Sequence, residues 1–178
     1  MQDTIIPQSI VATKNTRIGI LATPATIAHG AYQKALQEND KDIVITEQPC
    51  PELAPAIETL YNHPESLRQL IKTYLHSMKQ ANVDTIILGC THYALIKEIV
   101  RSECPGVTII SSDETISTLA NSCITTSHTT LQEHVFITTG DFEPFQVKVQ
   151  FLLQYFGMSK INYRVLKKPY VSFSGNTY

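Results

Sequence analysis

The 178-residue sequence is long enough for one domain with a buried core, and its 43% hydrophobic content is ordinary for a globular protein. Its 14 Lys and Arg residues nearly balance 16 Asp and Glu residues, and no dense basic run of the kind that binds nucleic acid occurs. No segment has the ~20 consecutive apolar residues of a membrane helix, and the amino terminus lacks a signal-peptide pattern. The sequence therefore indicates a cytoplasmic protein with neither nucleic acid nor membrane as a partner.

The chain opens with a segment of helical character and continues with short apolar runs. The segment SIVATKNT (residues 9–16) is too short to form a stable helix alone, so we expect it to pack against the rest of the fold. Brief, β-branched apolar runs then recur along the chain and predict buried strands. The expected strands are 17–22, 42–47, 84–89, 106–111 and 134–139.

Helical segments lie between these runs, and the clearest covers residues 64–82. Pro64 suits the first turn of a helix, and the apolar residues follow the i, i+3, i+4 spacing of a helix that buries one face. The expected buried positions are Leu67, Leu70, Ile71, Tyr74, Leu75 and Met78.

Strict alternation of strand and helix predicts βαβ units, and hence an α/β fold with a mainly parallel sheet flanked by helices. In such sheets ligands bind beyond the carboxyl ends of the strands. That rule selects the loops after the first three strands, ATPAT (22–26), EQPCPELAP (47–55) and GCTH (89–92).

Four cysteines occur, and they form neither a CxxC pair nor a Cys/His cluster with zinc-ligand spacing. We therefore expect reduced thiols without a bound metal. Free cysteine is among the most frequently buried residue types, so a buried structural role is the default for each of them. The four are Cys50, Cys90, Cys104 and Cys123.

Cys90 differs from the others because it lies where a buried strand ends and the helical segment 91–103 begins. A thiol at a helix N-terminus is close to the positive end of the helix dipole and to free backbone N–H groups, which favour the thiolate. His92 can supply positive charge or hold a proton near the sulfur, an arrangement that suits a nucleophile or a general base. The tripeptide alone is a weak signal, and Thr91 can equally be a helix N-cap.

The segment LGCTHYALI (88–96) resembles the second cysteine motif of the glutamate racemases, members of the aspartate/glutamate racemase superfamily. Further segments match that family in order and spacing, and the resemblance covers about residues 5–166. The matching segments are IIPQSIVATKNT (5–16), IGILATPATIAHGAY (18–32), PCPELAPAIE (49–58), SSDETIS (111–117) and ITTGDFEPFQVKVQFLL (137–153).

The resemblance implies an enzyme without a cofactor that interconverts L- and D-glutamate, the latter a component of peptidoglycan. Two cysteines on opposite sides of the substrate Cα exchange its proton in this family. By the match, Cys90 is one of these thiols, His92 assists it, and Glu58 orients the histidine. Thr91 contacts the substrate carboxylate or ammonium. Thr23 and Thr26 either reach the substrate or only cap a helix.

The family's first lobe carries an Asp-Ser-Gly loop and a Cys-Asn-Thr motif with the other thiol, and neither motif occurs in residues 1–178. We therefore expect a truncated chain with half of the active site, with Met1 just after the point where Cys-Asn-Thr ends. The expected organisation is an interdomain helix (1–16), a second lobe (17–112), a crossover with a closing β/α segment (113–166) and a tail (167–178).

Without the neighbours of the first lobe, the strand 134–139 and its helix are expected to expose apolar surface. This predicts a homodimer or a complex with a separate first-lobe chain. Two other interpretations remain open at this point. One is a one-cysteine enzyme of the superfamily, such as a decarboxylase, and the other is a non-catalytic or regulatory remnant that binds glutamate or a similar amino acid.

Overall fold

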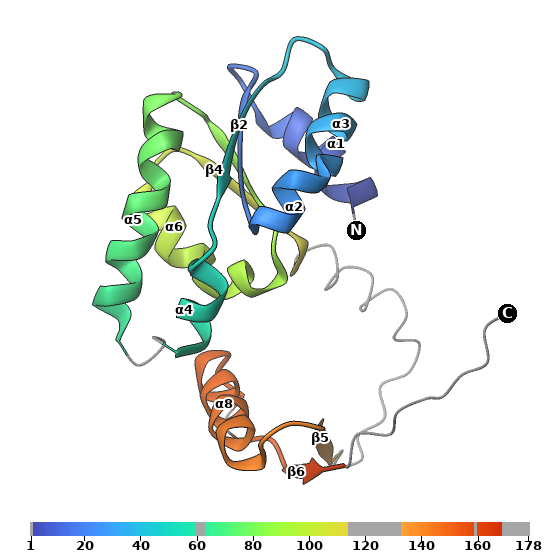
Figure 1. Cartoon of the computed structure of the whole chain (residues 1–178), viewed down its shortest axis with the longest axis vertical. Coiled ribbons are helices and arrows are strands. Elements are labelled where there is room, and N and C mark those ends of the chain that lie inside the picture. Colours follow the sequence, from blue (N-terminus) through green and yellow to red (C-terminus); the bar gives the residue numbers. More distant parts are fainter. Residues whose placement is uncertain (1, 60–62, 114–132, 159, 169–178) are drawn as a thin grey trace, which may run out of the picture. The chain divides into compact units, whose positions relative to one another are not determined.

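The computed structural model describes residues 2–59, 63–113, 133–158 and 160–168 (Figure 1). The chain divides into two compact units, Met1–Thr125 and Thr126–Tyr178, and each is described by itself. Of the expected segments, residues 114–132 with Cys123 and residues 169–178 of the tail lie outside the described residues.

Unit 1 is built on a four-stranded sheet in the order β2-β1-β3-β4, in which every neighbouring pair is parallel. This confirms the predicted α/β fold with a parallel sheet. The second strand begins two residues later than predicted, because the backbone N–H of Asp42 donates to Asp40 Oδ1 in a turn at 2.9 Å. The strands are β1 (Arg17–Ala22), β2 (Val44–Pro49), β3 (Thr85–Leu88) and β4 (Thr108–Ser111).

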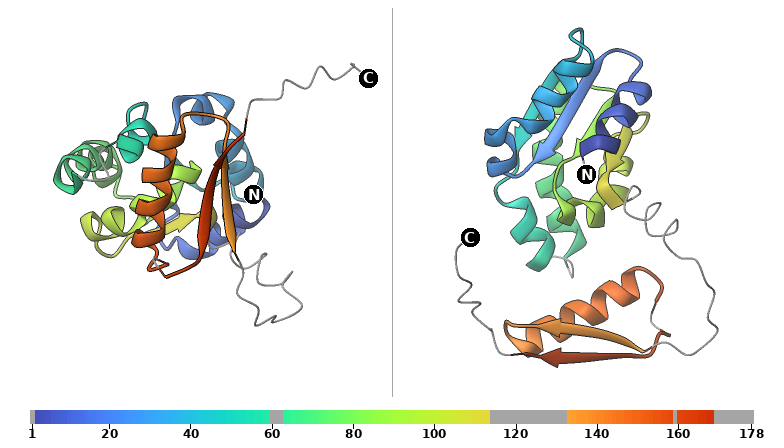
Figure 2. Two further views of the ribbon diagram at one scale, coloured as in Figure 1. Left: turned by 90° about the horizontal axis from the view of Figure 1, so that it is seen from below. Right: turned by 90° about the vertical axis from the view of Figure 1, so that its right-hand side faces the viewer.

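Helices cover both faces of this sheet (Figure 2). On one face, Ile18 and Ile20 of β1 pack with apolar residues of α1 and α3. On the other face, Leu21 and Ile86 pack with α4, α5 and α6. The described residues of unit 1 form the helices α1 (Gln2–Ala12), α2 (Pro24–His29), α3 (Ala31–Asn39), α4 (Leu53–Thr59), α5 (Pro64–Gln80) and α6 (Lys97–Glu103), with the 3-10 helix η1 (Thr91–Ile96) before α6.

The first helix lies earlier in the chain than the segment 9–16 suggested. It ends at Ala12, because the following residues form a loop held by the carboxylate of Asp84. Asp84 accepts hydrogen bonds from Thr13 Oγ1 at 2.6 Å and from the backbone N–H groups of Lys14 and Asn15 at 2.6 and 2.8 Å. The loop ends at Thr16, which has a positive φ of 59°.

Helix α5 follows the predicted pattern closely. Pro64 lies in its first turn, and Leu67, Ile71, Leu75 and Met78 are buried, while the predicted Leu70 and Tyr74 are partly buried against the same cluster. The helix ends at Gln80 because Asn82 takes a positive φ of 54°. A Cβ at Gly19 of β1 would overlap Met78 Sδ, so glycine leaves room for the Met78 thioether beside the sheet.

Unit 2 is a βαβ unit in which β5 (His134–Thr138) pairs in parallel with β6 (Tyr163–Lys167), with α8 (Phe142–Tyr155) between them in sequence. The fifth strand and its helix confirm the prediction, whereas β6 was not predicted. Phe136 and Tyr163 pack edge to face with their ring centroids 6.0 Å apart. Alternate residues point to the other face of the sheet and are exposed: Val135 by 43%, Ile137 by 48% and Leu166 by 37%.

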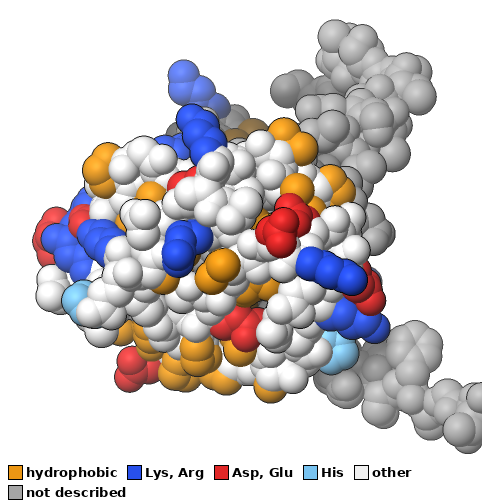
Figure 3. Space-filling model, turned by 90° about the horizontal axis from the view of Figure 1, so that it is seen from above, with side chains coloured by type: hydrophobic (Ala, Val, Ile, Leu, Met, Phe, Trp, Pro, Cys, Tyr) orange, Lys and Arg blue, Asp and Glu red, His pale blue; other side chains and the backbone are white. Residues whose placement is uncertain are grey.

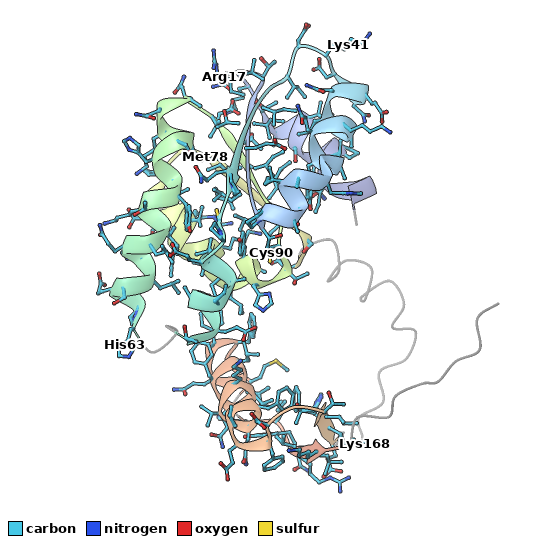
Figure 4. All side chains as sticks on the ribbon, viewed as in Figure 1. Arg17, Lys41, His63, Met78, Cys90 and Lys168 are labelled. Carbon is cyan, nitrogen blue, oxygen red and sulfur yellow. The ribbon has the colours of Figure 1, made fainter. Side chains whose placement is uncertain are left out.

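Charged side chains of both signs are interspersed on the face that Figure 3 shows, which is the end of unit 1 near Arg17 and Lys41 (Figures 3 and 4). Within the described ranges, no helix is long and apolar enough to span a membrane. Among the same residues, His, Cys, Asp and Glu side chains form no group of three that could hold a metal ion.

Candidate active site

Cys90 lies directly beyond β3, at the end of the sheet remote from Arg17 and Lys41 (Figure 4). The ladder with β1 continues to the preceding residue, since Gly89 N donates to Leu21 O at 2.8 Å. Gly89 is therefore the last residue hydrogen-bonded to the sheet, and this bond fixes the position of the Cys90 backbone that follows it.

The helix after Cys90 differs from the predicted continuous helix 91–103. Cys90 rather than Thr91 takes the N-cap position, and the chain makes the 3-10 helix η1 before α6 begins at Lys97. In a 3-10 helix the side chains at i and i+3 eclipse, and Tyr93 and Ile96 both enter the core in this way. Burial of both Tyr93 and Ile96 on one face explains why this segment forms a 3-10 helix instead of an α-helix.

Gly89 allows close packing beside the thiol. A Cβ at this position would lie 2.9 Å from Ala22 Cβ and 3.2 Å from Tyr32 Cε2. The first distance is shorter than carbon–carbon packing permits. Glycine therefore lets β1 and the ring of Tyr32 close in on the residue before Cys90.

His92 connects Cys90 to Glu58 of α4. Its Nδ1 lies 3.9 Å from Cys90 Sγ, and its Nε2 lies 2.9 Å from Glu58 Oε1. An ionised carboxylate can only accept hydrogen bonds, so Nε2 carries the proton and Nδ1 faces the sulfur. Three residues that the sequence singled out thus form one connected array, although Glu58 and His92 are 34 positions apart in the sequence.

Thr23 and Thr26, the threonines that follow β1, have different roles. Thr23 is the N-cap of α2, and its Oγ1 accepts from Thr26 N at 3.3 Å. The two hydroxyl groups share a hydrogen bond of 2.9 Å. Of the two roles expected for these threonines, Thr23 therefore caps a helix, whereas Thr26 also lines the cavity beside Cys90.

A cavity of ≈390 Å³ opens beside Cys90, within the size range of small-ligand sites. Of its lining residues with polar side chains, Tyr32 and Ser112 were not among the predicted site residues. Ser112 directly follows β4, so the rule on strand ends could have selected it, whereas Tyr32 enters from the first turn of α3 and has no such signal. The lining residues are Thr26, Tyr32, Leu88, Gly89, Cys90, Thr91 and Ser112.

Tyr32 supplies a phenol to this cavity. Burial raises the pKa of its hydroxyl, and negative charge on Cys90 raises it further. The hydroxyl therefore stays protonated and can donate a hydrogen bond to a ligand.

The other described cysteines are buried, as predicted, and their raised pKa values disfavour the reactive thiolate. Cys50 is fully buried, its Sγ donates to Gln48 O at 3.3 Å, and burial raises the pKa of its thiol to about 12. Burial also raises the pKa of Cys104, which lies at the end of α6. Neither thiol lines the cavity, so Cys90 is the cysteine of this cavity among the described residues.

A parallel α/β sheet with a thiol, an imidazole–carboxylate pair and hydroxyl groups beyond its strand ends supplies groups that can transfer protons to and from a small polar ligand. The chain belongs to the Asp/Glu/hydantoin racemase family, whose sequence model matches residues 7–119.

Individual relatives are glutamate racemases. The chain is 33% identical over 144 residues to that of Exiguobacterium sibiricum, covering 78% of this chain and 53% of the relative. It is 38% identical over 115 residues to that of Aliarcobacter butzleri, covering 63% and 44%. The crystal structure of glutamate racemase isoform RacE1 from Bacillus anthracis superposes with a TM-score of 0.72 at 30% identity, covering 93% of this chain and 63% of RacE1. The chain thus spans about half the length of these two curated relatives.

Proposed function

We propose that this chain contributes one side of a glutamate racemase-like site, in which Cys90 exchanges the Cα proton of glutamate or a closely related amino acid without a cofactor. The single observation that carries the proposal is the array Cys90–His92–Glu58 beside a ligand-sized cavity. Membership of the racemase family supports it. D-Glutamate for peptidoglycan is the product that the similarity to glutamate racemases suggests.

In the proposed reaction, His92 Nδ1 takes the thiol proton of Cys90 and the resulting thiolate attacks the Cα–H bond. The proton moves to sulfur, and its electron pair remains on Cα, delocalised into the substrate carboxylate. Glu58 stabilises the imidazolium that forms on His92, as a carboxylate behind a catalytic histidine does. The hydroxyl groups of Thr26 and Thr91 are available to bind the substrate carboxylate or ammonium.

One thiol reaches only one face of Cα, so inversion needs a second acid on the opposite face. Cys50 does not meet this need, because it is fully buried and its thiol has a pKa of about 12. We propose that the second group comes from a further polypeptide segment, either a separate first-lobe chain or a second copy. The exposed sheet face of Val135, Ile137 and Leu166 is a candidate contact surface for such a partner.

The test is incorporation of deuterium at Cα of L- and D-glutamate in heavy water, with the wild-type chain and Cys90→Ser. Cys104→Ser is the matched control, since this thiol is buried at the end of α6. We expect exchange by the wild type and the control, and none by Cys90→Ser. Equal exchange by Cys90→Ser would overturn the proposal.

Cys90 as the one cavity thiol among the described residues also fits a one-cysteine enzyme of the superfamily, such as a decarboxylase that protonates an enolate from one side. Carbon dioxide release from a substituted malonate, without exchange on glutamate, would favour that reaction. Glutamate binding without exchange or decarboxylation would favour a regulatory binding protein.

A further inference from the structure

We propose that Tyr93 is a positioning residue that holds His92 and Glu58 in register by tying the turn after Cys90 to the helix that carries Glu58. Its importance for catalysis rests on the proposed function, but the tie itself is independent of any activity. Tyr93 is fully buried, and its hydroxyl donates to the carbonyl oxygen of Cys50 at 3.2 Å.

The Cys50 carbonyl lies at the start of α4. The same oxygen accepts from Leu53 N, the first residue of α4, at 3.4 Å, and Cys50 N donates to Ala22 O of β1 at 2.8 Å. The Tyr93 hydroxyl therefore binds backbone that is anchored to the sheet on one side and opens α4 on the other. Glu58 lies five residues further along this short helix.

The backbone of Tyr93 is also bonded to Cys90, at the start of the 3-10 helix η1. Its backbone N donates to Cys90 O at 3.0 Å, and its neighbour His92 is the residue that bonds Glu58. Two links thus join the same two elements: the buried hydroxyl link of Tyr93 and the half-exposed pair of His92 and Glu58. Half-exposed pairs contribute little order by themselves, so the buried link sets the separation that the exposed pair requires.

Packing alone does not require a tyrosine at this position. The ring lies in an apolar cluster with Leu53, Ile57 and Ile96, where phenylalanine fills nearly the same volume. The hydroxyl is thus the feature that distinguishes tyrosine here, and its partner is a backbone group at the α4 start. Burial raises the pKa of this hydroxyl, so it remains a donor at neutral pH.

The test follows the ring tautomer of His92 by ¹⁵N NMR in the complete chain. In the wild type we expect the Nε2–H tautomer, because Glu58 accepts from Nε2. Tyr93→Phe should release Glu58 and raise the Nδ1–H form to roughly a third of the population. Tyr74→Phe is the matched control, since Tyr74 donates to the side chain of Glu52 at 3.2 Å rather than to the backbone of this turn, and it should leave the tautomer unchanged.

A double substitution separates positioning from stability. In the Glu58→Gln background, Tyr93→Phe should not change the His92 tautomer further. Tyr93 acts on the tautomer only by positioning the Glu58 carboxylate, and this variant has no carboxylate at position 58. Exchange at the glutamate Cα should show a kcat about fivefold lower in Tyr93→Phe with KM within about twofold. If Tyr93→Phe fails to fold, 4-aminophenylalanine at position 93 retains a donor and 4-fluorophenylalanine does not, so the pair provides the same comparison.

An unchanged His92 tautomer in Tyr93→Phe, with only a lower unfolding midpoint, overturns the positioning role. Absence of Cα exchange in the wild type counts against the proposed function instead, and the tautomer measurement still decides the role of Tyr93.

Discussion

The imidazole of His92 is held between a thiol and a carboxylate, with its Nε2 2.9 Å from Glu58 Oε1 and its Nδ1 directed at Cys90 Sγ. This order fixes the direction of proton movement. The carboxylate holds the proton on the far nitrogen, so the near nitrogen is free to receive the thiol proton.

Replacing Glu58 by Gln should slow Cα exchange by about tenfold to a hundredfold, because the amide can bond either tautomer of His92 and does not stabilise an imidazolium. The side chain is 44% exposed, so the thermal unfolding midpoint should change little. Exchange rates and circular dichroism melts measure the two effects. The control is Glu52→Gln, an exposed carboxylate near the same helix, and equal rates for both variants would contradict the array.

Gly89→Ala should destabilise unit 1 by about 1–3 kcal/mol, because the new Cβ would lie 2.9 Å from Ala22 Cβ and press on the ring of Tyr32. Urea unfolding at equilibrium measures the loss. Gly140→Ala is a suitable comparison, since its Cβ would meet only Thr138 Oγ1 at an ordinary 3.6 Å. A Gly89→Ala variant as stable as the wild type would show that this contact relaxes freely.

Asp84 makes the stability of unit 1 depend on pH in the acidic range. Burial raises the pKa of its carboxyl, but hydrogen bonds from Thr13, Lys14, Asn15 and Thr85 outweigh this and hold the pKa below its ordinary value. Because the folded pKa is lowered, the stabilisation is complete above the unfolded value and is lost as pH falls through the folded value.

Asp84→Asn should therefore lower the free energy of unfolding by about 1–2 kcal/mol at pH 7, and the difference from the wild type should shrink below about pH 4. Urea unfolding across pH 2–7, with exposed Asp42→Asn as the comparison, measures this. A difference that stays constant down to pH 2 would show that the carboxylate charge is not what holds the loop.

The sheet face of unit 2 should mediate self-association or binding of a partner, since a parallel sheet is normally covered on both faces. Ile137 is 48% exposed on this face, and Ile137→Glu should shift a concentration-dependent sedimentation profile toward the monomer. Val147→Glu places the same charge at an exposed position of α8 instead and should have less effect. A wild-type chain that sediments as a monomer at every concentration, with no partner, would refute this prediction.

The strand pattern was predictable because β1, β3 and β4 are short, largely buried apolar runs, as with Ile18 to Ala22, whereas β2 is only partly buried. The strand β6 was not predicted because YRVLK is short and has only two aliphatic residues between the charged Arg164 and Lys167. The turn after Cys90 was misjudged for a different reason: the 3-10 geometry depends on the burial of Tyr93 and Ile96, which is a tertiary effect.

For the candidate site, position along the chain indicated Cys90 and His92 because both follow a strand end. No local pattern links Glu58 to them, since Glu58 and His92 are 34 positions apart and meet only because α4 packs against η1. Family resemblance alone suggested that pairing. Tyr32 could not be predicted as a site residue, because its ring reaches the cavity only where Gly89 has no side chain.

The stereochemical course of Cα exchange tests the central claim most directly. Glutamate of each hand is incubated with the purified chain in heavy water, and deuterium content and chirality are measured in the same samples. A single Cys90 thiol that serves one face predicts deuterium in one enantiomer with retained configuration. Racemisation at concentrations where the chain sediments as a monomer, at a rate equal to that of exchange, would contradict the one-sided site.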